Sequence, residues 1–341
     1  MLMDKLVRRV QSLGLDLKGK VVLTEAATGP YVVTPILAAL AGAKVYAFSK
    51  STVYGSVRQV IRITREVYMP YRPDLDIHFI DQLTPEIIHQ ADVITNSGHL
   101  RPLNRQLLQH ARDSVVIPLM YEAWEWRSQD MDMDYIRERG FRVGATNERH
   151  EEVDVFSYLG DMAVKQIFDA GLCLNNNTFI LVCNNDFGPY IARGVSRLCR
   201  KLGVIDLPLN RKNYLDLPVE WLGDFPDLTI PAAYRDAEAV IFTAYPFDLT
   251  WLGNDSPLSP YALKKGLSHP MILRYAGDVD AEFLGRLGIR CFPRDVRSGH
   301  MGILPSEIGY DAIIRLQAGG LKVAEGLLAG RYQDNPFIQA L

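Results

Sequence analysis

The sequence reads "ATGPY" at residues 27–31 and "DFGPY" at residues 186–190, and this repeated Gly-Pro-Tyr decides the predicted fold. Each copy follows a short apolar run, residues 21–23 or 179–182, that is typical of a strand buried on both faces. Proline suits the first turn of a helix because no backbone donor is needed there. The two segments match at an offset of 159 residues (Gly188 minus Gly29), which is too long for a solenoid repeat and indicates a duplicated domain.

Strand and helix patterns alternate through both halves of the chain. Further strands are predicted at residues 44–48, 77–80, 91–95, 115–119, 141–144, 204–207, 239–243, 271–275 and 290–292. Helical spacing separates them at residues 57–67, 84–90, 104–111 and 133–138, and Val195, Leu198 and Leu202 predict a helix that Gly203 ends. This alternation predicts an α/β protein with two Rossmann-like domains, each with a mainly parallel, doubly wound sheet.

The length of 341 residues also favours two domains, because a single hydrophobic core stops growing below this size. We expect crossing helices to join the domains, since residues 155–167 and the stretch near the C-terminus both show helical spacing. The predicted organisation is a first domain with an N-terminal helix (1–150), a bridging helix (151–174), a second domain (175–305) and a C-terminal helix that packs back across the interface (306–341).

Composition excludes several classes of protein. The chain is 48% apolar and 23% charged, and its net charge of −3 argues against nucleic-acid binding and against binding to an anionic membrane. No apolar run reaches the roughly 20 residues of a membrane span, and the N-terminus lacks signal-peptide features, so we expect a cytoplasmic protein. The four cysteines show no metal or disulfide spacing, and no metal site is predicted. A small molecule is the expected partner, and a homodimer is plausible although the sequence does not show one.

The Gly-Pro-Tyr turns match a dinucleotide-binding loop only in part. On the GxGxxG template, Gly29 and Gly188 hold the second glycine position alone, and Pro30 and Pro189 remove a backbone donor that would face a phosphate. The loops therefore predict either a modified ligand site or a turn retained for architecture. The candidate cofactor-binding residues are Glu25, Thr28, Gly29, Ser49, Lys50, Ser51, Asn184, Asp186 and Gly188. The hydroxyl-and-lysine group at residues 49–51 favours NADP over NAD, because no acid stands there to bind a ribose.

Polar residues also follow the later strands of the first half, where ligands of open parallel sheets bind. The candidate substrate-binding residues are Asn96, Ser97, Arg101, Tyr121, Glu125, Asn147 and Glu148. We predict an acid-base pair of His99 and Glu122, because a histidine titrates near neutral pH and a carboxylate can orient it. Each residue also has a structural alternative: Arg101, for example, could pair with a nearby carboxylate instead of binding substrate.

Two segments resemble the D-2-hydroxyacid dehydrogenase and S-adenosylhomocysteine hydrolase group. "ADVITNSGHLRPLNRQLL" (91–108) is similar to the family segment that follows the fourth strand of the cofactor domain. "GHMGILPSEIGYDAIIRLQAGGLKVAEGLLAGR" (299–331) is similar to the family's histidine-bearing loop and the helix after it. The resemblance implies a tandem Rossmann architecture and places His300 where the family keeps its acid-base histidine.

Together these features favour an enzyme that binds a nucleotide-type ligand and a small polar substrate in the interdomain cleft. An NADP- or NAD-dependent oxidoreductase is one form of this hypothesis. One alternative is a non-redox enzyme that acts on a nucleotide sugar or an adenosyl compound. The other is a non-catalytic ligand-binding or regulatory protein, which the degenerate glycine loops favour.

Overall fold

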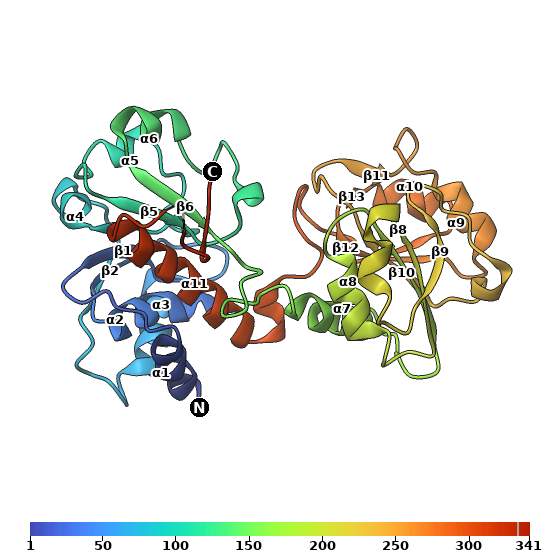
Figure 1. Ribbon diagram of the computed structural model, residues 1–341, viewed down its shortest axis with the longest axis horizontal. Helices are drawn as coiled ribbons and strands as arrows, with labels where there is room; N and C mark the ends of the chain where they lie inside the picture. Colours follow the sequence, from blue (N-terminus) through green and yellow to red (C-terminus); the bar gives the residue numbers. More distant parts are fainter. Residues whose placement is uncertain (333) are drawn as a thin grey trace. The chain divides into compact units, whose positions relative to one another are not determined.

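The computed structural model describes residues 1–332 and 334–341, which form two compact units (Figure 1). Residues Met1–Val155 and Gly309–Leu341 form the first unit, and residues Phe156–Ile308 form the second. Each unit contains a mainly parallel sheet with helices around it, so the expected fold class is confirmed.

The first unit is a doubly wound domain. Its elements are α1 (Leu2–Ser12), β1 (Val21–Glu25), η1 (Gly29–Val32), α2 (Val33–Leu40), β2 (Lys44–Phe48), α3 (Val57–Tyr68), β3 (Ile77–Ile80), α4 (Pro85–Gln90), β4 (Val93–Ile94), α5 (Arg105–Leu108), β5 (Val116–Leu119), η2 (Ala123–Glu125), α6 (Met133–Arg139), β6 (Arg142–Thr146), α11 (Asp311–Leu328) and β15 (Ile338–Gln339). The strand order is β15-β6-β5-β4-β1-β2-β3, in which β15 is antiparallel to β6 and the other pairs are parallel.

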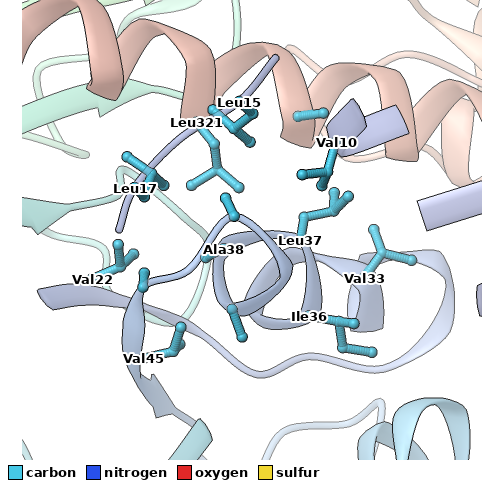
Figure 2. Close-up of a cluster of buried hydrophobic side chains, with 14 of the residues drawn as sticks. Val10, Leu15, Leu17, Val22, Val33, Ile36, Leu37, Ala38, Val45 and Leu321 are labelled. Atoms are coloured by element: carbon cyan, nitrogen blue, oxygen red, sulfur yellow. The ribbon is translucent and has the colours of Figure 1, made fainter. Parts of the chain in front are cut away.

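Alternation along the strands divides the core of the first unit between the two faces of its sheet. Val22 packs with α1, α2 and α11 on one face, and its neighbour Leu23 packs with α4, α5 and α6 on the other. Figure 2 shows part of the first of these cores, to which α1 contributes Val10, α2 contributes Leu37 and α11 contributes Leu321. The C-terminal helix α11 thus belongs to the core of the first unit.

The second unit repeats this plan with the middle of the chain. Its elements are α7 (Tyr158–Asp169), β7 (Thr178–Cys183), α8 (Gly188–Val195), β8 (Lys201–Asp206), η3 (Pro208–Tyr214), β9 (Glu220–Asp224), η4 (Ala232–Tyr234), β10 (Ala239–Thr243), β11 (Thr250–Leu252), α9 (Pro260–Gly266), β12 (Met271–Ala276), β13 (Asp278–Val279), α10 (Ala281–Arg286), β14 (Arg290–Phe292) and η5 (Pro305–Ile308). The main sheet has the order β14-β12-β10-β7-β8-β9, and every pair in it is parallel.

The helix after the second Gly-Pro-Tyr is shorter than predicted. It ends at Val195, whereas Leu202 and Gly203 lie in β8, which begins at Lys201. Leu198 is half exposed and therefore belongs to no buried helical face. Leu202 fits the helical spacing by coincidence, because a strand buried on both faces can place apolar residues at any position.

Both Gly-Pro-Tyr segments make the first strand-to-helix turn of their unit, as predicted. The turn at Gly29 begins η1 and continues into α2, and α8 begins at Gly188. No helix in the described part of the chain is long and apolar enough to cross a membrane.

Candidate functional site

The strand order reverses at one point in each main sheet. In the first unit β1 lies between β2 and β4, and in the second β7 lies between β8 and β10. Leaving out β15, both sheets follow the order 3-2-1-4-5-6 of dinucleotide-binding Rossmann domains. Ligands of such sheets bind beyond the carboxyl ends of the strands at this reversal.

A buried carboxyl group ends β1 in the first unit. Glu25 is buried, and its Oε2 accepts a hydrogen bond of 3.0 Å from the backbone N–H of His99. Burial raises the pKa of Glu25, and the nearby His99, Arg101 and Lys50 oppose that shift. The structure therefore brings together three loops of the predicted site, those after β1, β2 and β4.

Two further carboxyl groups of the first unit lie in contact with each other. The side chains of Glu125, in η2, and Glu148, after β6, are hydrogen-bonded to each other. Burial raises the pKa of Glu125 to about 7, and the neighbouring Glu122 charge adds to this shift. Burial, with Glu125 and Glu122 beside it, also raises the pKa of Glu148 well above its ordinary value. The pair therefore holds a proton near neutral pH, as a general acid-base group requires.

Tyr31, the tyrosine of the first Gly-Pro-Tyr, lies among these carboxyl groups. Burial raises its pKa to about 12, and the charges of Glu25, Glu125 and Glu148 raise it further, whereas Arg101 lowers it. Its hydroxyl makes no hydrogen bond with a described residue. Tyr31 was not predicted as a site residue, although its place in the repeated turn was a signal for it.

Glu122 does not pair with His99 as we predicted. Its buried carboxylate accepts hydrogen bonds from Trp124 Nε1 at 2.7 Å and from Gln339 Nε2 at 2.9 Å, and it forms an ion pair with Arg149 at 3.4 Å. Through these partners Glu122 connects the η2 turn to the C-terminal strand β15, and its carboxylate does not orient His99. The Nδ1 atom of His99 is buried and has no partner among the described residues.

Arg101 anchors the loop after β4. Its Nε donates to Asn96 Oδ1 at 2.7 Å, its guanidinium lies 4.8 Å from the centre of the Tyr121 ring, and Asp130 is 3.7 Å from Nη1. Asn96 Nδ2 in turn donates to the Tyr121 hydroxyl at 3.0 Å. The structural alternative for Arg101 thus accounts for most of its donors, and its charge still acts on Glu25 and Tyr31.

Some of the other predicted residues of the first unit are hydrogen-bonded within the protein, and others have a polar atom without a partner among the described residues. Ser97 belongs to a buried hydroxyl cluster with Thr24 and Thr95, and Asn147 binds the backbone of the C-terminal segment at Pro336 and Phe337. Ser49 is buried, and its hydroxyl has no partner among the described residues. The exposed Ser51 accepts a bond of 3.4 Å from the backbone of α3, and Thr28 precedes η1 without capping it.

The predicted residues of the second unit lie in the loops after β7 and β14 and at the start of α8. Asn184 exchanges two hydrogen bonds with the backbone of Tyr245, of 2.7 and 3.1 Å. Asp186 is exposed, and Gly188 is buried at the start of α8. His300 lies in a loop anchored through Asp278, which forms an ion pair with Arg274 and accepts hydrogen bonds from Ser298 and the Gly299 backbone.

Sequence reasoning missed one acid of the second unit. Asp206 ends β8 and is fully buried, and it accepts hydrogen bonds from Tyr214 Oη, Asn210 Nδ2 and its neighbour's backbone N–H. It follows Gly188 by 18 residues (Asp206 minus Gly188), close to the spacing at which the Rossmann fingerprint places its ribose-binding acid. That spacing was a signal available in the sequence.

The reversal point of the second unit is crowded at Gly188. A Cβ atom on Gly188 would overlap the Tyr214 hydroxyl and would lie 2.9 Å from both Asp206 Oδ2 and Cys183 Sγ. The unit's own side chains therefore fill the space beside the second glycine position of the fingerprint. In the first unit the same direction from Gly29 is open to at least 4 Å, and Lys50 is near, but Glu25 would repel a phosphate.

Two other features carry no site. A surface pocket of about 860 Å³ lies between the end of α11 and the C-terminal segment, and two of its charged residues, Lys322 and Glu325, pair with each other at 2.8 Å. Among the described residues, no group of three or more His, Cys, Asp or Glu side chains is arranged to hold a metal ion.

Comparison with known proteins supports the fold. No family model and no curated protein matches the sequence. Among solved structures, a dipicolinate synthase chain from Bacillus subtilis is similar with a TM-score of 0.60 at 11% identity, covering 93% of this chain and 99% of that one. Its counterpart from Bacillus halodurans gives 0.59 at 12%, covering 92% and 99%. An NAD-dependent formate dehydrogenase from Staphylococcus aureus, solved in complex with NAD, gives 0.55 at 11%, covering 93% and 98%. The expected resemblance to tandem-Rossmann dehydrogenases is confirmed, and at these identities it concerns the fold.

Proposed function

We propose that this protein is an enzyme that uses the Glu125–Glu148 pair as its acid-base group on a small polar substrate. The observation that carries the proposal is the contact between two carboxyl groups with raised pKa values at the carboxyl edge of the first sheet, with Tyr31 beside them. With a pKa of about 7, Glu125 can both accept and return a proton at neutral pH.

The residues around the pair have separate roles in this proposal. Tyr31 offers a hydroxyl with no other partner, and the buried Ser49 hydroxyl and His99 Nδ1 offer further unused hydrogen-bonding groups. Arg101 supplies positive charge near Tyr31 while its own position is fixed by Asn96. A substrate hydroxyl bound at Tyr31 would pass its proton to the ionised carboxylate of the pair, and in the reverse direction the protonated carboxyl group would return that proton.

A pyridine nucleotide is the second candidate ligand, and the open space at Gly29 with Lys50 nearby favours it at the first unit. The similar formate dehydrogenase was solved with NAD, which supports an oxidoreductase among the reactions that need a proton acceptor. The segment Ser49-Lys50-Ser51 contains no acid at the end of β2, which favours the 2′-phosphate of NADP over NAD, although the charge of the nearby Glu25 opposes a phosphate.

A thermal-shift panel of NADP, NAD, S-adenosylmethionine, S-adenosylhomocysteine and nucleotide sugars tests the ligand class. A ligand at a hundred times its Kd adds roughly 2.7 kcal/mol to the free energy of unfolding. A shift with NADP supports the oxidoreductase. A shift with only adenosyl compounds or nucleotide sugars supports a non-redox enzyme, and no shift with any of them favours a non-catalytic role.

The acid-base role is tested with Glu125→Gln and Glu148→Gln. Turnover is measured with a small polar substrate and the nucleotide-type ligand that the panel identifies. Each variant should lower kcat by about 10²-fold or more, since general acid-base catalysis contributes about 10²–10⁴-fold. Glu151→Gln is the matched control, because Glu151 is exposed in the same unit. Unchanged kcat in both variants would refute the proposal.

A further inference from the structure

The second unit has an acid, Asp206, at the position of the ribose-binding acid of nucleotide-binding domains, but this acid is buried and bonded to the unit's own side chains. Asp206 stands at the end of the second strand of its sheet, beside β7 and 18 residues after Gly188 (Asp206 minus Gly188). An acid at this place in a Rossmann domain binds the hydroxyl groups of the adenosine ribose. Here the Tyr214 hydroxyl donates to Asp206 Oδ2 instead.

Tyr214 occupies the space between this acid and the helix that begins at Gly188. Its hydroxyl lies where a side chain on Gly188 would be, and Asp206 Oδ2 is 2.9 Å from the same point. Asp206 is 0% exposed and Tyr214 is 4% exposed, so solvent does not reach this space. A ribose bound to Asp206 would need the volume that the Tyr214 hydroxyl fills.

Several contacts hold Tyr214 in this position. Its ring packs edge to face on Trp221 with 5.9 Å between ring centres. Asn210 Nδ2 and the Leu207 backbone N–H donate to the other oxygen of Asp206, at 3.1 and 2.6 Å. Displacing Tyr214 would leave a buried carboxyl oxygen without its donor, which is unfavourable.

We infer that the Tyr214 hydroxyl takes the place of a ribose hydroxyl, so that the second unit is closed to dinucleotides at its reversal point. Asn184 joins the loop after β7 to the loop after β10, because both groups of its side-chain amide are hydrogen-bonded to the backbone of Tyr245. If the second unit is closed, a nucleotide-type ligand would bind at the first unit, near Gly29 and Lys50. This part of the inference rests on the proposed function.

The test uses the full chain with ADP-ribose and, separately, NADP as probes. Kd is measured by calorimetry for the wild type, for Asp206→Asn in the second unit and for Lys50→Ala in the first. Hydrogen exchange with and without probe is then followed on peptides that cover residues 25–33, 183–190 and 206–214. The exchange measurement needs no variant, so it remains informative if Asp206→Asn does not fold.

The inference predicts that Asp206→Asn changes the Kd for ADP-ribose by less than twofold and that residues 183–190 and 206–214 gain no protection. Lys50→Ala should weaken NADP binding, with protection confined to residues 25–33. A Kd at least tenfold weaker in Asp206→Asn, or protection at residues 206–214, would overturn it. If neither probe binds the wild type, the closure of the second unit is supported and the nucleotide in the proposed function is refuted.

Discussion

Gly29 and Gly188 hold the same place in their Gly-Pro-Tyr turns, but different physical constraints require a glycine at each. Gly29 has a φ of +62°, which residues with a side chain rarely adopt, and its surroundings are open. Gly188 has no such φ, but Tyr214, Asp206 and Cys183 leave no room for a Cβ atom. One turn thus needs glycine for its backbone conformation, and the other needs it for close packing.

The side chains around the two turns differ in the same way. In the first unit, Tyr31, Ser49 and His99 each keep a polar atom without a hydrogen-bond partner among the described residues. In the second, Asn184 and Asp206 direct their polar atoms to Tyr245, Asn210 and Tyr214. A buried polar group without a partner is costly, so unused groups gathered at one turn indicate a place for a ligand.

The largest expected effect concerns the first turn and its carboxyl pair. The folded pKa of Glu125, about 7, is raised from 4.5, so the folded state binds more protons than the unfolded state between these values. Stability is therefore full below pH 4.5 and is lost as the pH rises towards 7, by on the order of 3 kcal/mol for such a shift. The pKa of Glu148 is also raised and acts in the same direction, so urea unfolding of Glu148→Gln across this range should show a flatter dependence on pH.

Glu151→Gln is the control for this experiment, because an exposed carboxylate should leave the pH dependence unchanged. If Glu148→Gln shows the same slope as the wild type, the pKa values of this pair are not raised. The raised pKa values of a carboxyl pair would then no longer distinguish the first turn from the second.

The next effect concerns packing at the second turn. Gly188→Ala should destabilise the protein by about 2 kcal/mol, because overpacking of a buried site costs about 1–3 kcal/mol. In a Tyr214→Phe background the same substitution should cost at least about 1 kcal/mol less, since the overlapping hydroxyl is gone and contacting residues couple by about 0.5–3 kcal/mol. Equal costs in both backgrounds, measured by urea unfolding, would show that Tyr214 does not fill the space above Gly188.

The sequence was sufficient to predict the tandem fold, because Val21–Leu23, Gly29-Pro30-Tyr31 and their later copies report local strand and turn physics. Glu125 and Glu148 were also among the predicted substrate-binding residues. Their partnership could not be predicted, because it depends on how the loops after β5 and β6 meet in space. The same holds for Glu122, whose partner Gln339 is 217 residues away in the chain. Asp206 was not predicted although its spacing from Gly188 can be read from the sequence. Only the structure shows that the Tyr214 hydroxyl is hydrogen-bonded to its carboxylate.

The smallest effect separates the two glycines directly. Gly29→Ala should cost about 1 kcal/mol, because the left-handed conformation is unfavourable for alanine and no atom stands in the way of its Cβ. Gly29→Asn should cost less, since asparagine tolerates this conformation better than other residues with a side chain. At Gly188 the order must reverse, because the larger asparagine fits less well than alanine into a filled space. Urea unfolding of the four variants measures both orders, and the same order at both positions would mean that one constraint governs both turns.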